Sequence, residues 1–288
     1  MSPEIAEQIA AIGRVIDPVK TGAIYAPLHD REPFAGVKIS RDIRYGPADR
    51  NLLDIFTAQG ASGTRPVMIF VHGGGFVGGN KSTPGSPFYD NVPLWAARNG
   101  LVGVNITYRL APQAPWPAGA EDVGLAVRWV MDNIAGYGGD PSRIFLFGHS
   151  AGATHAGSYA AMPQFHGVRG IGIAGLILTS GIYDFTDFPL TDNHKSYTGS
   201  DTSLLAARSP LSGLRSLPVP ALIAGAELDP PAFIDQHRKL VDAMAQAPGG
   251  KPRVVALKGH SHLSLGFSIG TDETALTGPI LDFVSNVK

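Results

Sequence analysis

The sequence predicts an α/β fold, in which a mostly parallel central sheet carries helices on both faces. Short apolar runs of strand length, such as residues 66–71, continue without a polar interruption, which is typical of strands covered on both sides. Segments with helical apolar spacing separate these runs along the chain. Strands that alternate with helices favour parallel pairing, because a helix returns the chain to the same edge of the sheet.

The amino-terminal part departs from this alternation. A helix is expected over residues 2–15, where apolar residues recur at spacings of three and four after a Ser-Pro start. Residues 16–40 show no dependable period. Residues 43–45 and 52–56 suit two antiparallel strands joined by a polar turn.

The alternating pattern then runs to the end of the chain. Strands are predicted over residues 66–71, 101–106, 143–147, 171–178, 219–224 and 253–257. Helices are predicted over residues 92–98, 120–134, 153–161, 233–245 and 273–287. Residues 182–216 interrupt the pattern and are expected to form a lid or substrate wall over the carboxyl edge of the sheet. We therefore expect one domain over residues 1–288, with a small cap built from residues 1–40 and 182–216.

Composition excludes several classes of function. The 23 basic and 24 acidic residues leave a formal net charge of -1, so no bulk attraction to nucleic acid or to an anionic membrane is expected. The chain has no cysteine, which removes disulfides, thiolate catalysis and thiolate metal sites. The amino terminus lacks the pattern of a secretory signal, and no apolar run is long enough to span a bilayer. A cytoplasmic location is the expectation.

A serine lies on a tight turn between a predicted strand and a predicted helix. Gly148-His149-Ser150-Ala151-Gly152 follows the strand at 143–147 directly and opens the helix at 153–161. Such a turn pushes the serine hydroxyl outward, and the flanking glycines let neighbouring backbone pass. Ser150 is therefore the candidate nucleophile. A G-x-S-x-G string also arises by chance in a chain with 36 glycines, so its context has to agree.

A run of glycines follows another predicted strand. Gly73-Gly74-Gly75 follows residues 66–71 after the single residue His72, and glycines free backbone N–H groups to point into a cavity. The alternatives are a flexible loop or a phosphate cradle. The phosphate interpretation is weak, because Asn80 stands before Lys81 where a P-loop has glycine.

Two further groups that acyl transfer needs follow the last two predicted strands. Asp229 comes just after residues 219–224, and His262 comes after residues 253–257. A carboxylate can orient an imidazole, and the imidazole can take the serine proton. In a parallel sheet the carboxyl ends of the strands meet at one edge. Glu227 or Asp184 could supply the carboxylate instead of Asp229, and His260 could be the base instead of His262.

Two competing motifs are discounted. Residues 170–175 match G-x-G-x-x-G, but they overlap a predicted strand instead of following one. His260 and His262 could begin a metal site, yet no third ligand stands at a recognisable spacing. No cofactor and no metal are expected. Of the other histidines, His72 is expected to hold the glycine run in shape, and His149 could line a pocket.

Four motifs, taken together, resemble a known family. They are His72-Gly73-Gly74-Gly75-Phe76, Tyr108-Arg109-Leu110-Ala111-Pro112, Gly139-Asp140-Pro141-Ser142-Arg143 and the elbow around Ser150. In this order they resemble the hormone-sensitive-lipase-like and carboxylesterase branch of the α/β-hydrolases. Residues 180–184, with Ser209-Pro210-Leu211, also resemble feruloyl-esterase-like and arylformamidase-like relatives.

The resemblance implies an α/β-hydrolase fold and a set of site residues. It implies a triad of Ser150, Asp229 and His262, and an oxyanion hole formed by the backbone N–H groups of Gly74, Gly75 and Ala151. Two positions depart from the family pattern. His149 stands before the serine where many lipase-like members carry an acid, and the closing histidine lies in His-Ser-His-Leu-Ser where the family has His-Gly-Phe. The second departure keeps His260 open as the base.

The expected function is that of a serine carboxylic-ester hydrolase acting on small or short-chain acyl or aryl esters. An arylformamidase-like amidase is the alternative, and a ligand-binding protein without turnover is a third possibility. The expected partner is a small-molecule ester, with neither nucleic acid nor membrane, and a homo-oligomer is possible. Five aromatic residues could wall an apolar pocket or could belong to the core. They are Phe76, Trp116, Phe185, Phe188 and Tyr197.

Overall fold

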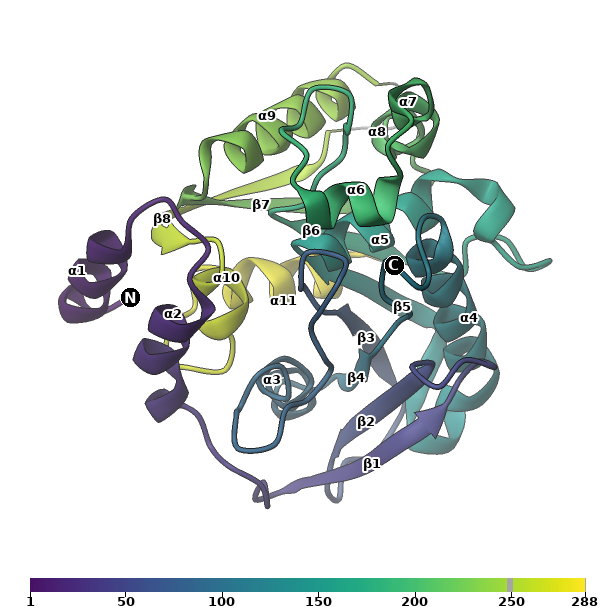
Figure 1. The fold of residues 1–288 in the computed structure, drawn as a ribbon. Helices are drawn as coiled ribbons and strands as arrows, with labels where there is room; N and C mark the ends of the chain where they lie inside the picture. The colour runs from purple at the N-terminus through teal and green to yellow at the C-terminus, as the bar shows by residue number, and fades with distance from the viewer. Residues whose placement is uncertain (248–250, 288) are drawn as a thin grey trace.

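One twisted sheet forms the centre of the molecule (Figure 1). The computed structural model describes residues 1–247 and 251–287, and eight strands of this part pair in the order β1-β2-β4-β3-β5-β6-β7-β8. The strands are β1 (Val37–Arg44), β2 (Leu52–Ala58), β3 (Arg65–Val71), β4 (Val102–Ile106), β5 (Gly139–His149), β6 (Gly175–Thr179), β7 (Ala221–Leu228) and β8 (Arg253–Ser261). β2 pairs antiparallel with both β1 and β4, and all later pairs are parallel.

Helices cover both faces of the sheet. They are α1 (Pro3–Ile12), α2 (Pro18–Tyr25), α3 (Asn91–Arg98), α4 (Ala118–Asn133), α5 (Ala151–Ala161), α6 (Asp192–Thr198), α7 (Leu205–Arg208), α8 (Leu211–Leu214), α9 (Pro231–Ala245), α10 (Ser264–Phe267) and α11 (Thr277–Asn286). Side chains of α4, α5, α8 and α9 pack on one face, and those of α1, α3, α10 and α11 pack on the other. This arrangement confirms the predicted α/β class.

The alternation of side chains along β3 explains why its sequence is apolar throughout. Val67, Ile69 and Val71 belong to the core on the α4 and α5 face, whereas Met68 and Phe70 belong to the core on the α3 face. All five side chains are at most 1% exposed. A strand buried on both faces favours apolar residues at successive positions.

The elements of the amino-terminal region differ from the prediction: the first helix is shorter, a second helix was not predicted, and the first strand begins earlier. The first helix ends at Ile12, because Gly13 adopts φ 77° and caps it, so it does not reach residue 15. A second helix, α2, lies in residues that showed no period; it begins at a proline after Asp17, whose side chain accepts from the Lys20 N–H. β1 begins at Val37, six residues before the predicted strand.

Two later boundaries also differ from the prediction. β6 begins at Gly175 and not at residue 171, because the chain turns at Gly170 and Gly172, with φ values of 77° and 62°. The last helix begins at Thr277 and not at residue 273. In both places an apolar run continues through a turn, and hydrophobicity alone does not reveal where the regular element starts.

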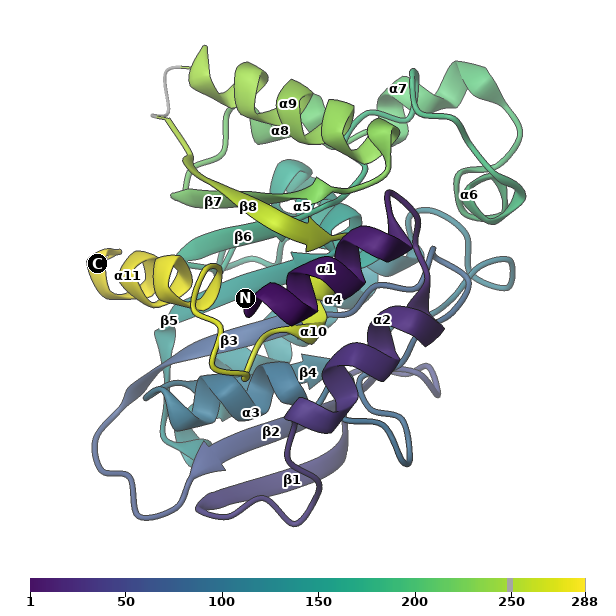
Figure 2. The ribbon, with the colours of Figure 1, turned by 90° about the vertical axis from the view of Figure 1, so that its left-hand side faces the viewer.

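Two segments lie beyond the carboxyl ends of the parallel strands. Figure 2 shows α2 and α6 on the side toward which β7 and β8 point, with α11 at the opposite end of the sheet. Within the segment 182–216, α6 therefore lies at the carboxyl edge of the sheet (Figure 2), whereas α8 packs on the face that carries α4 and α5. In the described part of the chain, no helix has the length and apolar character needed to cross a membrane.

Candidate active site

Ser150 occupies a sharp turn between β5 and α5. Its backbone has φ 57° and ψ -124°, a conformation that costs free energy for any residue with a Cβ and persists only where the surroundings hold it. The Ser150 N–H donates to the carbonyl of Thr179 on β6 over 2.9 Å. A Cβ on Gly152 would lie 2.0 Å from the carbonyl oxygen of Val71 on β3, so only glycine fits there. The turn is thus fixed against both neighbouring strands.

Ser150, His262 and Asp229 form one chain of hydrogen bonds. The Ser150 Oγ lies 2.8 Å from His262 Nε2, and His262 Nδ1 lies 2.6 Å from Asp229 Oδ1. Asp229 directly follows β7, and His262 directly follows β8. His262 and Asp229 are buried, and Ser150 is 9% exposed. An imidazole between a carboxylate and a hydroxyl can draw the hydroxyl proton.

The environment of Asp229 keeps its carboxyl group charged. Burial by itself raises the pKa of this group, but the His262 imidazole and three hydrogen bonds outweigh burial and lower the pKa below its ordinary value. The Ser180 hydroxyl donates to Asp229 Oδ2 over 2.5 Å, and the Ala226 N–H donates to the same oxygen over 3.2 Å. This role of Ser180 was not predicted, although its place directly after a buried strand, β6, was a usable sign.

The rival residues make other contacts. His260 Nε2 lies 2.7 Å from Glu273 Oε1, and its Nδ1 lies 3.0 Å from the hydroxyl of Ser264. The Glu227 carboxylate is exposed and accepts from the N–H of Gly259. Asp184 pairs with Lys239 at 2.8 Å. None of these contacts involves Ser150 or Asp229.

The glycine run after β3 passes beside Ser150. A Cβ on Gly73 would lie 3.0 Å from the Cβ of Ser150. Gly74 has φ 145°, and a Cβ there would lie 2.1 Å from the carbonyl oxygen of Gly78. Among the described residues no group accepts from the N–H of Gly74 or Gly75. Ala151 is the first residue of α5, where a backbone N–H has no partner within the helix.

His72 supports the glycine run from below. Its Nδ1 donates to the carbonyl oxygen of Gly73 over 2.7 Å, and the Tyr108 hydroxyl donates to the His72 carbonyl over 2.8 Å. Burial lowers the pKa of His72 to about 3, so its imidazole is neutral near pH 7. This neutral ring stacks on Tyr108 at 4.5 Å.

His149, the residue before Ser150, contacts the backbone of His262. Its Nε2 donates to the carbonyl oxygen of His262 over 2.8 Å, while its Nδ1 is buried and has no hydrogen-bond partner among the residues that the structure describes. Burial, followed by the nearby His262, lowers the pKa of His149 to about 4, which keeps the ring neutral near pH 7. The contact links the nucleophile turn to the loop that carries the imidazole, and no pattern in the sequence indicated it.

A pocket of about 570 Å³ opens at these residues. Ser150, His262 and the three glycines at 73–75 line it. Part of the wall is apolar and includes Ile16, Pro18, Phe88, Phe233 and Phe267. Another part is polar and includes Asn80, Thr83, Ser86, Asn193 and His194. No group of three or more His, Asp or Glu side chains with the arrangement of a metal site occurs in residues 1–247 and 251–287.

Of the five aromatic residues considered as pocket walls, only Phe76 lines the pocket. Phe76 stacks on Tyr197 of α6 at 4.3 Å, and Phe185 and Phe188 belong to the same buried cluster. Trp116 packs against this cluster from outside. Of the two interpretations left open for these residues, the buried core therefore holds for Trp116, Phe185, Phe188 and Tyr197, and the pocket wall holds for Phe76.

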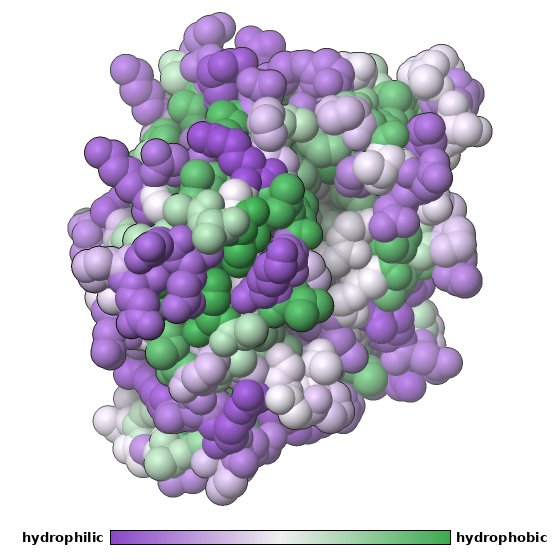
Figure 3. All heavy atoms as spheres, turned by 60° about the vertical axis from the view of Figure 1, so that its left-hand side comes forward, coloured by the Kyte–Doolittle hydropathy of each residue, from purple (hydrophilic) through white to green (hydrophobic). Residues whose placement is uncertain are grey.

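The amino-terminal segment closes one side of the pocket. Arg14 donates to the carbonyl oxygens of Glu227 and Asp229 over 2.6 and 3.4 Å, which ties this segment to the loop after β7. Ile16 and Pro18 follow in the pocket wall. On the face that carries α1 and α2, hydrophobic side chains gather at the surface (Figure 3). Val15, Ile16 and Val19 are 52%, 46% and 79% exposed.

The chain is similar to a known family and to known proteins. The BD-FAE family matches residues 53–240. The chain belongs to the BD-FAE family. The match contains the glycine run, Ser150 and Asp229, and it ends before His262. Esterase LipQ of Mycobacterium tuberculosis is 33% identical over 227 residues, which is 72% of this chain and 52% of that protein.

Other relatives are longer proteins as well. Liver carboxylesterase 1 of Oryctolagus cuniculus is 32% identical over 196 residues, 63% of this chain and 31% of that protein. The chain of this BD-FAE family member thus spans about half the length, or less, of these two curated relatives.

Solved structures share the fold over almost the whole chain. Esterase B from Lactobacillus rhamnosis has a TM-score of 0.76 at 18% identity, covering 98% of this chain and 97% of its own. An esterase from Pyrobaculum calidifontis has a TM-score of 0.71 at 22% identity, covering 100% and 98%. This BD-FAE family member has the α/β-hydrolase fold, as its motifs predicted.

Proposed function

We propose that this protein is a serine hydrolase of carboxylic esters, with Ser150 as the nucleophile. The observation that carries the proposal is the chain of hydrogen bonds at 2.6 and 2.8 Å from Asp229 through His262 to a hydroxyl that lines a pocket. The names of the relatives, LipQ esterase and liver carboxylesterase, support the same reaction class.

In the proposed reaction His262 Nε2 takes the Ser150 proton as Oγ attacks the ester carbonyl. Asp229 holds the imidazole in the required tautomer and stabilises its charged form. The N–H groups of Gly74, Gly75 and Ala151 then donate to the oxyanion of the tetrahedral intermediate. His262 gives its proton to the leaving alcohol, and water releases the acid by the reverse sequence.

The free N–H groups beside Ser150 carry most of the proposed stabilisation. Backbone donors that are fixed before the reaction need no rearrangement when charge develops on the carbonyl oxygen. Each donor in such a site contributes about 3 kcal/mol to the stability of the transition state. The strained turn at Ser150 and the φ of 145° at Gly74 are consistent with a backbone held in place for this task.

The proposed substrates are small or short-chain acyl or aryl esters. A pocket of about 570 Å³ lies in the range of sites for small molecules, and its apolar wall suits an aliphatic or aromatic group. In this proposal residues 1–40 and 182–216 act together as a cap, because Ile16 and Pro18 of the first and Asn193 and His194 of the second face the pocket.

The structure gives no specific support to the arylformamidase alternative. That alternative rested on residues 180–184, and Ser180 bonds to Asp229 while Asp184 pairs with Lys239. The hydrogen bond from Ser180 to Asp229 would act in the same way on an ester and on an amide, and Asp184 does not line the pocket. Rates on a formyl anilide and on a phenyl ester of similar size compare the two activities directly.

The replacement of Ser150 by alanine tests the proposal. Ser150→Ala should lower kcat for p-nitrophenyl butyrate by a factor on the order of 10⁴ or more, because the variant lacks the hydroxyl that attacks the ester carbonyl. An organophosphate should label the wild-type protein with one equivalent and should not label the variant. Unchanged turnover in a variant with wild-type circular dichroism would remove Ser150 from the mechanism.

A further inference from the structure

A loop between the glycine run and α3 forms one wall of the pocket. We call residues 79–90 the pocket loop. Its members Asn80, Thr83, Ser86, Phe88 and Tyr89 all line the pocket. The loop contains no helix or strand, so backbone pairing within a regular element does not fix its shape. The side chains that hold it come from other parts of the sheet.

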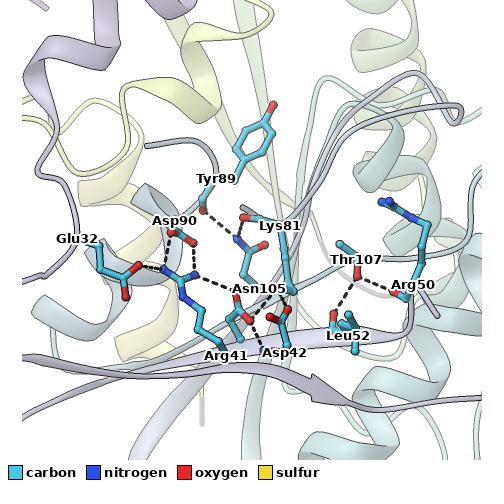
Figure 4. A network of polar contacts seen from close by, with 11 residues as sticks. Glu32, Arg41, Asp42, Arg50, Leu52, Lys81, Tyr89, Asp90, Asn105 and Thr107 are labelled. Carbon is cyan, nitrogen blue, oxygen red and sulfur yellow. Dashed lines mark hydrogen bonds and ion pairs between the residues drawn. The ribbon is translucent and has the colours of Figure 1, made fainter. Parts of the chain in front are cut away.

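One buried amide holds the two ends of the pocket loop together (Figure 4). Asn105 lies on β4 and is 0% exposed. Its Nδ2 donates to the carbonyl oxygens of Lys81 and Tyr89 over 2.5 and 3.0 Å. The Tyr89 N–H also donates to the Lys81 carbonyl over 3.3 Å. These hydrogen bonds hold the two ends of the pocket loop, at Lys81 and Tyr89, close together.

Charged groups hold the first end of the pocket loop, at Lys81. The Lys81 ammonium lies 2.7 Å from Asp42 Oδ1 and 2.8 Å from Asp54 Oδ1. The Lys81 side chain is 5% exposed and that of Asp54 is 0% exposed. An ion pair in such a buried position has little water to screen it, and breaking it leaves an unpaired buried charge.

A second cation holds the other end. Arg41 donates to both carboxylate oxygens of Asp90, each over 2.7 Å, and to Asp54 Oδ2 over 2.8 Å. Asp90 is the last residue of the pocket loop. Asp54 thus accepts from Lys81 and Arg41 at once, and it joins both ends of the loop to β2. Figure 4 shows these side chains converging, with Glu32 on the outer side of Arg41.

A bulge in β1 brings the two residues of that strand to this place. The pairing of β1 with β2 shifts register between Ser40 and Ile43, so two residues, Arg41 and Asp42, stand opposite Asp54 alone, and the edge strand has one extra residue. Asp42 has φ 54°, and its N–H donates to Asp54 Oδ1 over 2.7 Å. A bulge of this kind redirects side chains, here toward the pocket loop.

We propose that Lys81 and Arg41 are positioning residues that fix the pocket loop and thereby set the preference of the pocket for larger esters. The inference rests on the proposed ester hydrolysis at Ser150. Charge-assisted hydrogen bonds at fixed angles define one position of the loop, whereas apolar packing alone would allow several. Neither cation lines the pocket, so their effect on substrate passes through Thr83, Ser86, Phe88 and Tyr89.

The test compares a short with a long ester in Lys81→Met, which keeps the apolar stem and removes the charge. The ratio of kcat/KM for p-nitrophenyl octanoate to that for p-nitrophenyl acetate should fall about tenfold. Without the ion pair the pocket loop becomes mobile, and binding of a long ester has to order it, which costs binding free energy. The loss should lie in KM, because the wall contacts ground state and transition state alike. Equal losses on both esters, or no change, would overturn the inference.

Two further variants complete the test. Arg41→Gln should shift the ratio in the same direction and stay folded, because its side chain is 26% exposed at the sheet edge. Lys239→Met is the matched control: Lys239 also pairs with two carboxylates, those of Asp184 and Asp187, and lies outside the pocket. Its ratio should equal that of the wild type.

Hydrogen exchange separates this inference from the proposed function. Amide exchange in residues 82–89 should rise at least about tenfold in Lys81→Met and remain at the wild-type rate in Lys239→Met. Wild-type protein that hydrolyses neither ester would refute the proposed function, and the exchange data would still judge the loop. Unchanged exchange in both Lys81→Met and Arg41→Gln would refute the positioning role.

Discussion

The centre of the candidate site and the walls of its pocket are built in different ways. In the centre, Ser150, Asp229 and His262 each directly follow a parallel strand, and the glycine run follows another. The sheet therefore places these groups through backbone pairing. The walls come from the amino-terminal segment, the pocket loop and α6, which are held by side-chain contacts over long sequence distances.

This difference separates what each region can change. A group fixed by the sheet has one position relative to the reacting carbonyl, so its loss should appear in kcat. A wall held by side chains can shift without moving the centre, so its variants should act on KM and on substrate preference. The three predictions below test this division, from the largest expected effect to the smallest.

The two histidines at the end of β8, His260 within the strand and His262 directly after it, give the sharpest contrast at the candidate site. His262→Ala should lower kcat for p-nitrophenyl butyrate by a factor on the order of 10⁴, because the Ser150 hydroxyl loses its base. His260→Ala should lower kcat by less than about tenfold and should lower the free energy of unfolding by roughly 1–3 kcal/mol, because it leaves the Glu273 carboxylate without this partner.

Steady-state kinetics and urea unfolding of both variants distinguish these effects. The opposite ranking, with His260→Ala nearly inactive and His262→Ala active, would transfer the base to His260. It would also show that proximity at the strand ends does not identify the reacting group.

His155 lies where the centre meets the wall, and it should make stability depend on pH. Its ring packs against Phe76 and Tyr197, and burial, followed by the nearby His72, lowers its pKa from 6.5 to about 3. Below pH 6.5 the unfolded chain therefore binds a proton that the folded protein excludes until about pH 3. The free energy of unfolding should therefore decrease as the pH is lowered through this window, and this one group should contribute about 2 kcal/mol of the decrease between pH 7 and pH 5.

His155→Gln isolates that contribution. The difference in unfolding free energy between pH 7 and pH 5, measured by urea denaturation, should be about 2 kcal/mol smaller in the variant than in the wild type. The comparison uses the pH difference and not the absolute stability, so lost packing does not affect it. Identical differences in the two proteins would show that His155 is protonated to the same extent when folded and unfolded.

Ser180 should give the smallest effect of the three. Ser180→Ala removes the 2.5 Å hydrogen bond to Asp229, which keeps its contacts to His262 and to the Ala226 N–H. We expect kcat to fall about tenfold with KM unchanged, in line with one lost hydrogen bond to a charged group. Ser158→Ala is the control, since Ser158 is a buried serine of α5 whose hydroxyl has no partner. A loss in KM instead of kcat would assign Ser180 to the wall.

The sequence was informative about the centre for a physical reason. A strand buried on both faces is an unbroken apolar run, and the polar or glycine residues directly after it stand at the carboxyl edge. Gly74, Ser150, Asp229 and His262 could all be found this way. The choice between His262 and His260 could not, because the sequence does not show that β8 continues to Ser261 and so does not tell which of two neighbouring imidazoles turns toward Ser150.

The walls could not be predicted because their contacts join distant parts of the chain. The ion pairs of Lys81 depend on a bulge in β1, and a bulge is one extra residue that no local pattern marked. Ile16 and Pro18 lie in a region without apolar period. The aromatic residues around Phe76 have the same composition whether they line a pocket or support it from below.

The turn at Ser150 touches two strands at once, through the Thr179 carbonyl on β6 and the Val71 carbonyl on β3. The position of the Ser150 hydroxyl is therefore fixed by two strands, one on each side of β5. A core substitution that slides either strand would misplace it, however far that substitution lies from any substrate. Substitutions that change the pocket without moving Ser150 are then confined to surfaces that leave both strands in place.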